Sequence, residues 1–427
     1  MKIVLIEPVA SKANVYSKLH MPLLGPVYLG TILKNRGHEV EIYNEDIYRP
    51  DYSRLKADLI GISILTSTAK RGYDIARLFP KEKVVIGGVH ASLLPEEALN
   101  FCRQVVIGEG EEVIAGIAEG SITDRMVYGK PVENLDNLPR PDFSLIKGYK
   151  GSSMTPISTS RGCPFDCTFC SVTKLFGRKY RFRSAGNVMQ ELLSRKHNSF
   201  FFCDDNFTAH PNRTRRLLDE MLKYKVRKWA CQVRCDVAKD KKLLSLMASA
   251  GCSVACIGFE SVNLKTLEAY EKKQSLEDII NAIRSFHREK IKIHGMFVLG
   301  SDNDSAKTVW DTLRFAIKQK IDTIQMSILT PFPGTKVHEE LKEQKRIFSQ
   351  DWSLYDGQHV VFQPKLVSAI QLQLNVVKAY TKFYSLSRSF ALLLKMRFRN
   401  AIFRFMGYRI VRDWRSRNRK MHWILQD

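Results

Sequence analysis

Three cysteines lie close together near the middle of the chain, in a segment whose residue types and spacing can support redox chemistry. The segment reads Arg-Gly-Cys-Pro-Phe-Asp-Cys-Thr-Phe-Cys over residues 161–170, and its cysteines are Cys163, Cys167 and Cys170. It follows residues 155–160, a predicted strand. Cysteine thiolates are the usual ligands of iron–sulfur clusters, and short spacings let one loop hold one cluster. In a [4Fe–4S] cluster, three cysteines would leave one iron open to a small molecule.

Two other interpretations of this spacing are a zinc loop and cysteines that serve only in packing. Zinc sites usually use paired C-x2-C units or a nearby histidine, and no histidine lies between Pro156 and Lys196. The spacing therefore favours a cluster. We expect five further cysteines to be packing residues: Cys203, Cys231, Cys235, Cys252 and Cys256.

Length and composition limit the class of protein. A chain of 427 residues predicts two or three domains. No run of about 18 apolar residues predicts a membrane span, and the N-terminus lacks the pattern of a secretory signal. Nine cysteines, an odd number without such a signal, favour a reducing compartment. We therefore expect a cytoplasmic protein.

The chain is strongly basic. It has 67 Lys and Arg against 44 Asp and Glu, a formal charge of +23. Such an excess favours an anionic partner, which could be nucleic acid, a membrane surface, a phosphorylated ligand or an acidic redox protein. A basic surface that only keeps the protein in solution is the other interpretation.

The first 120 residues alternate short apolar runs with stretches of helical periodicity. This alternation predicts a parallel sheet with helices on both faces, an α/β domain of Rossmann-like (flavodoxin-like) type over residues 1–125. The expected strands are 2–6, 39–43, 58–63, 83–86 and 104–107, and the expected helices are 23–36, 66–79 and 95–99. Ligands of such sheets bind beyond the carboxyl ends of the strands. The candidate binding residues there are Ser63, Gly87, Gly88, His90, Gly108, Glu109 and Gly110.

A proline- and glycine-containing segment, 126–154, predicts an extended connector. Longer strand–helix units then follow over residues 155–335 and predict a partial (β/α)6 TIM-like barrel. Its expected strands are 155–160, 200–203, 229–233, 254–259, 292–299 and 323–329. Residues 336–427 are expected to be a helical, basic C-terminal region.

Polar side chains follow three of the barrel strands, where such barrels place their chemistry. Asp204 and Asp205 follow the second strand and would repel each other unless they face cations; a solvated turn or helix cap is the alternative. Gln232 and Arg234 lie on one face of the third strand, and Glu260 ends the fourth. Arg234 and Glu260 could bind a ligand or form an ion pair that closes the barrel.

These features resemble the radical S-adenosylmethionine (SAM) superfamily, in the branch with an N-terminal cobalamin (B12)-binding domain. The resemblance rests on the cysteine segment, with the aromatic Phe169 before its last cysteine, and on residues 22–29, 87–92 and 108–111. It implies that the open iron of a [4Fe–4S] cluster binds SAM. It also implies that Phe169 and the acidic, amide and basic side chains named above contact SAM, and that the N-terminal loops contact cobalamin.

One feature departs from many cobalamin domains, because the chain has no Asp-x-His-x-x-Gly segment. The histidines of the first 120 residues are His20, His38 and His90, and only His90 lies in a candidate ligand loop. We therefore expect that cobalt has no histidine ligand from below, and that the loop of His90 contributes mainly backbone contacts.

The resemblance implies an enzyme that reductively cleaves SAM to give a 5′-deoxyadenosyl radical, with cobalamin-dependent methylation of an unactivated carbon as the expected reaction. Cyclisation, oxidation or carbon–carbon coupling without methyl transfer remains open. So does a non-enzymatic iron–sulfur binding or sensing protein, although this would require loss of the SAM-contacting residues. The expected partners are a small-molecule or lipid-like substrate and a reduced flavodoxin or ferredoxin.

The C-terminal segment after Ser385 interleaves eleven Lys and Arg with apolar and aromatic residues, and only Asp413 and Asp427 oppose them. A basic helix with an apolar face can lie in an anionic membrane interface. It could equally pack over the mouth of the barrel with its charges in solvent. Nucleic acid is not expected, because no RNA-binding module is recognisable.

Overall fold

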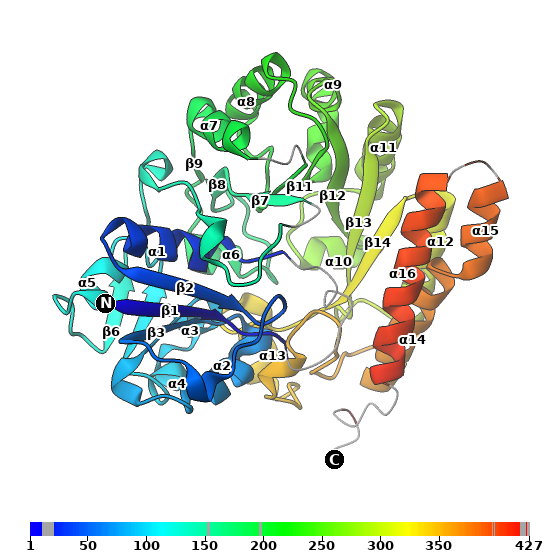
Figure 1. Ribbon diagram of the computed structural model, residues 1–427. Coiled ribbons are helices and arrows are strands. Elements are labelled where there is room, and N and C mark those ends of the chain that lie inside the picture. Colours follow the sequence, from blue (N-terminus) through cyan, green and yellow to red (C-terminus); the bar gives the residue numbers. More distant parts are fainter. Residues whose placement is uncertain are drawn as a thin grey trace.

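A computed structural model of the protein describes residues 1–10, 21–151, 154–195, 199–394, 396, 398–418 and 424. Two parallel sheets and a group of C-terminal helices make up this part of the chain (Figure 1). His20 and four of the eleven C-terminal cations (Lys395, Arg397, Arg419 and Lys420) lie outside the described residues.

The N-terminal domain is a six-stranded parallel sheet with strand order β2-β1-β3-β4-β5-β6. Its strands are β1 (Lys2–Glu7), β2 (Glu39–Asn44), β3 (Leu59–Ser63), β4 (Val84–Gly87), β5 (Gln104–Gly108) and β6 (Met126–Gly129). Its helices are α1 (Leu24–Asn35), α2 (Ala69–Ala76), α3 (Val89–Leu93), α4 (Pro95–Leu99) and α5 (Ile114–Ala118). The predicted α/β fold is confirmed.

Side-chain alternation along β1 explains why both faces of this sheet are covered. Ile3 and Leu5 belong to a buried cluster with Val27 of α1. Val4 and Ile6 point to the opposite face, in a second cluster that includes Tyr73 of α2. An uninterrupted apolar strand is therefore buried on both sides, as in other doubly wound sheets.

The segment predicted as a connector contains a strand. β6 lies within 126–154 and pairs in parallel with β5, with Gly108 opposite Gly129. Further along, the amide of Asp142 donates to the Thr31 hydroxyl of α1 at 2.9 Å. The second half of the segment thus packs against the N-terminal domain.

The second sheet is an open barrel of six parallel strands in the order β14-β13-β12-β11-β10-β7. Its strands are β7 (Thr155–Ile157), β10 (Phe200–Phe202), β11 (Trp229–Val233), β12 (Cys252–Glu260), β13 (Lys292–Leu299) and β14 (Thr323–Ile328). Its main helices are α7 (Ala185–Ser194), α8 (Pro211–Lys223), α9 (Lys241–Ser249), α11 (Leu276–Arg288) and α12 (Ala306–Lys318). Cys231, Cys235 and Cys252 are buried in its core, as expected of packing residues.

The predicted strand 155–160 is split. β7 belongs to the barrel, whereas β8 (Ser160–Arg161) turns away and pairs antiparallel with β9 (Arg181–Phe182). The cysteine segment therefore begins on a small hairpin that leaves the barrel and returns to it.

Helix α14 (Ala369–Phe383) covers the open edge of the barrel at β14. The other C-terminal helices are α13 (Lys336–Glu343), α15 (Leu386–Leu394) and α16 (Phe398–Arg417). The Tyr384 hydroxyl accepts from the Ile324 amide and donates to the Ile324 carbonyl, both at 2.8 Å, and the Tyr380 hydroxyl accepts from the Met326 amide at 2.7 Å. These bonds satisfy backbone groups that an edge strand would otherwise leave unpaired.

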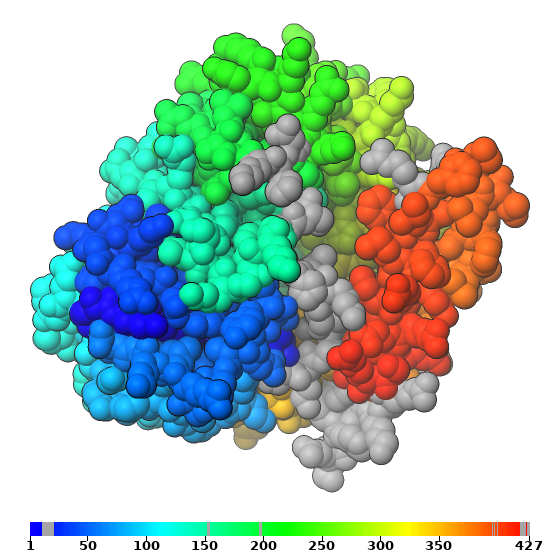
Figure 2. All heavy atoms as spheres, in the orientation of Figure 1, coloured from blue at the N-terminus to red at the C-terminus, as the bar shows by residue number. Residues whose placement is uncertain are grey.

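Helix α16 packs against α14 (Figure 1), and its Asn400 side chain donates to Asp322, just before β14. In Figure 2 this helix lies on the side of the molecule away from the N-terminal domain, not over the barrel mouth. Its Arg404 is buried, with the guanidinium carbon 3.6 Å from the ring centre of Phe383 and hydrogen bonds to the carbonyls of Phe383 and Ile321. Packing over the mouth, one of two expectations for this region, is therefore wrong. No helix among the described residues is both long and apolar enough to cross a membrane.

Candidate cofactor site between the two domains

A cavity of about 450 Å³ lies where the carboxyl ends of the two sheets face each other. The N-terminal domain lines it with six of the predicted residues: Ser63, Gly87, Gly88, Gly108, Glu109 and Gly110. The barrel lines it with Ser158, Ser160, Arg161, Cys203 and Asp205. Leu175 and Phe176 add apolar surface from α6 (Val172–Phe176), which lies between the domains in Figure 1.

At two of the predicted positions the backbone conformation favours glycine. Gly88 has φ +96° and Gly108 has φ +87°, conformations that residues with a side chain rarely adopt. A Cβ at Gly88 would lie 2.7 Å from the Ile64 carbonyl oxygen, and one at Gly108 would lie 2.8 Å from the Gly129 carbonyl oxygen. At Gly87 and Gly110 a Cβ would make only ordinary contacts, beginning at 3.6 and 3.5 Å.

His90 does not line the cavity, so its prediction as a cofactor contact is corrected. It lies in α3 with its side chain fully buried on the other side of the loop. Its Nε2 is 3.3 Å from Glu97 Oε1, its ring packs 5.1 Å from that of Trp352, and its amide donates to the Ile64 carbonyl. No histidine is among the described residues that line the cavity.

Glu109 borders the cavity, but its carboxylate joins the two domains. Its Oε2 accepts from Arg161 at 2.7 Å and from Arg181 at 3.0 Å, and Arg161 also pairs with Glu111. All four side chains are at most 12% exposed. We call these four residues the interdomain clasp. Because Arg161 lies two residues before Cys163, the clasp fixes the cysteine loop against the N-terminal sheet.

The clasp predicts a pH-dependent stability. Burial alone would raise the pKa of Glu109, but the hydrogen bond from Arg181 and the charge of Arg161 outweigh it and lower the pKa below its usual 4.5. A carboxyl whose pKa is lower in the folded state than in the unfolded state stabilises the fold at pH values above its unfolded-state pKa. That stabilisation is lost as the pH falls through the folded-state pKa. We expect Glu109→Gln to lower the free energy of unfolding by about 3–5 kcal/mol at pH 7, because it removes the carboxylate partner of the buried Arg181 and one of the two partners of Arg161.

Denaturant unfolding across pH checks this prediction. The difference between the native protein and Glu109→Gln should shrink below pH 4.5, the usual carboxyl pKa. Glu133→Gln is the control, because Glu133 is an exposed carboxylate that pairs with Lys179. A pH-independent difference would contradict the role assigned to the clasp.

The cysteine loop is anchored at several points. Gly162, at φ +86°, lets the chain pass the Lys179 carbonyl, which a Cβ would approach to 2.5 Å. Thr168 donates from its amide to the Tyr270 carbonyl at 3.4 Å, and its own carbonyl accepts from the Val337 amide at 3.3 Å. Phe169 packs edge-on against the Tyr270 ring at 4.9 Å, so it orients the loop from the protein side.

The three thiols fit an iron–sulfur cluster. Cys163, Cys167 and Cys170 are free and half-buried. Burial, with a further effect from neighbouring thiol and carboxylate charges, raises the pKa of Cys163 and raises that of Cys170 to about 12. A bound cation would be needed to keep such thiols ionised. Among the described residues, no three cysteine, histidine or acidic side chains converge closely enough for a single metal ion, whereas a cubane cluster binds each thiolate to a different iron.

The structure separates the two adjacent aspartates. Asp204 is buried, and its Oδ1 accepts from the amides of Thr159 and Ser160 at 2.7 and 2.9 Å. The side chain of Asp205 is exposed within the cavity, whose walls surround it. Burial and the charge of Asp204 raise the pKa of Asp205 to about 7, and its own charge raises the pKa values of Cys163 and Cys170. Of the pair, Asp205 is thus the one placed beside the cysteine loop.

An ion pair between Arg234 and Glu260, one of two alternatives for these residues, is not among the ion pairs of the described part of the chain. Glu260 has φ +61° and accepts from Lys272 at 2.6 Å. Arg234 donates to the Lys272 carbonyl at 2.6 Å, and its guanidinium stacks 3.8 Å from the Phe165 ring centre in the cysteine loop. Gln232 is half-buried on β11, and its carbonyl accepts from the Phe207 amide at 2.9 Å.

Lys272 and Cys203 were not among the predicted site residues. The ammonium of Lys272 is buried, which alone would lower its pKa, but the charges of Glu260 and the Cys167 thiolate raise it. It is therefore a fixed cation near the cysteine loop. Cys203, expected to serve in packing, is half-buried and lines the cavity just before Asp204. Only its position at a strand end could have indicated this.

We predict that Asp205→Asn weakens SAM binding by about 10- to 100-fold, the loss expected for one charge-assisted hydrogen bond. The measurement is equilibrium binding of SAM to cluster-loaded protein, with iron content as a second readout that should not change. Asp219→Asn, an exposed acid on α8, is the matched control. Unchanged SAM affinity in Asp205→Asn would rule out this role.

Comparison with known proteins agrees with this geometry. The Radical SAM superfamily model matches residues 157–316, and the B12 binding domain model matches residues 12–118. Bacteriochlorophyllide d C-12(1)-methyltransferase of Chlorobaculum tepidum is 33% identical over 77% of this chain and 75% of that protein. An anaerobic magnesium-protoporphyrin IX monomethyl ester cyclase of Rubrivivax gelatinosus is 25% identical over 90% of this chain and 77% of that protein.

The fold also matches a solved structure. The cobalamin-dependent SAM radical enzyme OxsB with aqua-cobalamin bound has a TM-score of 0.68 and 16% identity, covering 99% of this chain and 76% of that one. A B12-type sheet joined to a partial barrel with a three-cysteine loop defines a class of radical enzymes. The chain belongs to the radical SAM superfamily, in the branch with an N-terminal B12-binding domain. Its cofactors are a [4Fe–4S] cluster, SAM and cobalamin.

Proposed function

We propose that this enzyme is a cobalamin-dependent radical SAM methyltransferase that methylates an unactivated carbon. When bound, the cluster supplies the electron for SAM cleavage and cobalamin carries the methyl group. The observation that supports the proposal most is the shared cavity. The glycine turns of the B12-type sheet and Asp205 beside the cysteine loop line one space, so a substrate there could reach both cofactors.

The chain's own residues would divide the work of positioning. Cys163, Cys167 and Cys170 would hold the cluster, and Asp205 would accept from the SAM amino group. Arg234, Gln232 and the Glu260–Lys272 pair would position the remaining polar groups of SAM. The turns at Ser63, Gly88 and Gly108 would bring backbone close to cobalamin. The interdomain clasp would hold the two cofactor sites in a fixed position relative to each other.

The enzyme acts on a small molecule and requires a reductant. The names of the two relatives above refer to tetrapyrroles, bacteriochlorophyllide and magnesium-protoporphyrin. We therefore propose an apolar, ring-bearing substrate, with tetrapyrroles as the first class to test. Reduced flavodoxin or ferredoxin is the proposed electron donor. The proposed location is the cytoplasm, with peripheral membrane contact argued in the next subsection.

A second candidate is radical cyclisation or oxidation without methyl transfer, and the cyclase relative favours it. An anaerobic assay of the cluster-loaded protein with SAM, a reductant and cobalamin separates the two. Methyl transfer predicts both 5′-deoxyadenosine and S-adenosylhomocysteine, whereas other radical outcomes predict only the first. If neither product forms while the cluster is intact, an enzymatic function is contradicted.

A further inference from the structure

The turns at the amino ends of the barrel strands carry an unusual density of cations. The turns before β11, β13 and β14, counted with the last residue of the preceding helices α11 and α12, expose seven: Lys225, Arg227, Lys228, Arg288, Lys290, Lys318 and Lys320. Within the described residues, no ion pair neutralises any of the seven, and only the half-buried Glu289 and Asp322 are acidic in these turns. Four of the seven, Lys225, Lys228, Lys290 and Lys320, have φ between +54° and +62°, where glycine or asparagine would be less strained.

An exposed apolar surface adjoins these turns. Helices α15 and α16 form a hairpin whose outward side chains include Phe390, Leu394, Met396, Phe398, Ile402 and Met406, each at least 52% exposed. The opposite face of α16, at Ala401, Arg404, Val411 and Trp414, is buried. Apolar side chains in such a group, apart from the face that packs, mark an interaction surface.

The basic turns and the hairpin are contiguous. Lys320 shares a hollow with Arg388 and Leu392 of α15 and with Asn400 of α16. The Lys292 ammonium lies 4.8 Å from the ring centre of Phe403. Strands β11 and β14 are three positions apart in the sheet, so the turns before them lie about 15 Å apart at about 4.8 Å per strand.

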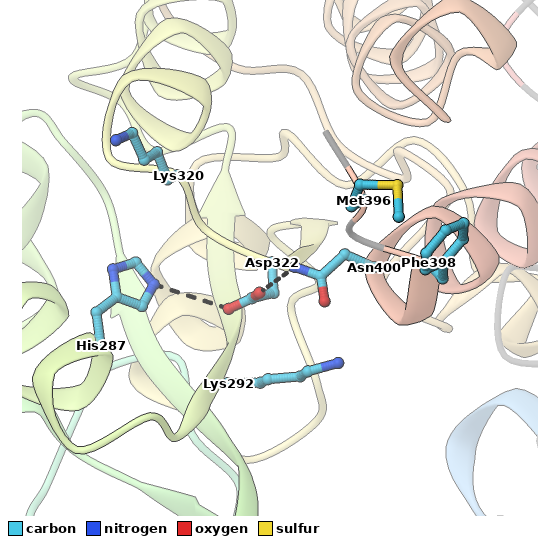
Figure 3. Close-up of a pocket in the computed structure, with 7 residues that line it drawn as sticks. All are labelled: His287, Lys292, Lys320, Asp322, Met396, Phe398 and Asn400. Atoms are coloured by element: carbon cyan, nitrogen blue, oxygen red, sulfur yellow. Dashed lines mark hydrogen bonds and ion pairs between the residues drawn. The ribbon is translucent and has the colours of Figure 1, made fainter. Parts of the chain in front are cut away.

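Between barrel and hairpin lies a hollow of about 670 Å³ (Figure 3). Lys292, Lys320 and His287 line one side, and Met396 and Phe398 line the other. Its single carboxylate, Asp322, is engaged by the Asn400 amide at 2.9 Å and the Ile293 amide at 3.0 Å, with His287 Nε2 3.7 Å away. Cations and apolar groups at one opening suit a phosphate headgroup with its acyl chains.

We propose that this face, made of the three basic turns and the six exposed apolar side chains of the hairpin, docks on an anionic membrane surface. The apolar hairpin residues enter the interface, and the lysines of the turns face the headgroups. Four of the six exposed apolar side chains are aliphatic or methionine and only two are aromatic, which favours lipid over nucleic acid, because single-stranded nucleic acid is bound by stacking on aromatic rings.

The orientation has a functional consequence. The strands are parallel, so the docking face lies at the end of the barrel opposite the cysteine loop and Asp205. Strand β13 has eight residues, which separates the two ends by about 26 Å at about 3.3 Å per residue. Docking therefore leaves the cofactor cavity facing away from the bilayer and open to a diffusing substrate and an electron donor.

Vesicle sedimentation of the full-length protein tests the proposal. We expect binding at low salt to vesicles of phosphatidylcholine mixed with phosphatidylglycerol, and none to phosphatidylcholine alone. Lys228→Gln/Lys320→Gln should weaken binding about 30-fold, the loss for two charges near the surface. Lys273→Gln/Lys345→Gln is the matched control, because both lysines are also exposed at positive φ, φ 51 and 53°, but lie on the mouth side.

A second pair of variants tests the apolar component. Leu394→Glu (86% exposed in the native protein) should abolish binding, whereas Leu78→Glu (59% exposed, in the N-terminal domain) should not. Retention in the supernatant with anionic vesicles at low salt would overturn the proposal. So would equal losses in the two lysine pairs, or equal binding to neutral vesicles. Single-stranded RNA binding of comparable strength that Leu394→Glu leaves intact would assign the charges to nucleic acid instead.

Discussion

Simultaneous replacement of Cys163, Cys167 and Cys170 by alanine should remove all bound iron, the visible absorbance of the cluster and SAM cleavage. The reason is chemical, because alanine offers no ligand and no other cysteine lies in the loop. The fold should survive, since the loop remains tied through Thr168 to the Tyr270 carbonyl and the Val337 amide. Circular dichroism should therefore be unchanged while iron falls to background.

The matched control replaces Cys252 and Cys256, which lie on β12. Loss of these thiols should cost on the order of 1 kcal/mol of stability each and leave iron content and SAM cleavage intact. Iron retained at the native level in the triple variant would refute the assignment of the cluster ligands. Iron lost from the control pair would indicate a second set of ligands on β12.

Much of the fold could be predicted from periodicity. The apolar runs of the first 120 residues and of 200–329 coincide with strands because parallel strands, buried on both faces, read as continuous apolar segments. Periodicity did not predict β6, because Met126–Gly129 is short and lies among prolines and glycines. Its pairing with β5 is decided by the neighbouring strand, not by its own sequence.

The location of the candidate site could be predicted from the sequence, but the hydrogen-bond and ion-pair partners of its residues could not. Asp204 and Asp205 look equivalent in sequence. Asp204 differs in the structure because β8 turns toward it, so that backbone amides donate to its carboxylate. Glu260 pairs with Lys272 because its left-handed backbone redirects the carboxylate. No local pattern encodes that conformation.

Contacts between domains were the least predictable feature. Glu109 looked like a ligand-loop residue, yet it binds Arg161 and Arg181, which follow it by 52 and 72 residues. His90 lies in a glycine turn, but the first turn of α3 directs its ring toward Trp352 of the C-terminal region. Such pairings arise from docking of separate units, which a single sequence does not reveal.

Replacement of Gly88 by valine should abolish cobalamin binding. The variant must adopt φ +96° with a Cβ 2.7 Å from the Ile64 carbonyl oxygen and 2.9 Å from the Ile64 amide nitrogen. The backbone must therefore shift at the point where β3 and β4 end against the cavity. Binding of hydroxocobalamin, measured by calorimetry, should fall below detection. Iron content should be unchanged, because the cluster depends on the barrel.

Two further variants separate backbone strain from loss of the cavity. Gly120→Val also places a side chain at positive φ (+77°), but a Cβ there meets nothing within 4 Å, so cobalamin binding should persist. Gly110→Leu has an unstrained backbone and lines the cavity, so it should weaken binding by occupying space without unfolding the domain. If Gly88→Val and Gly110→Leu both bind cobalamin like the native protein, cobalamin does not occupy this cavity. A calorimetric blank for the intact, cluster-loaded protein would remove methyl transfer and leave a radical enzyme that works without cobalamin.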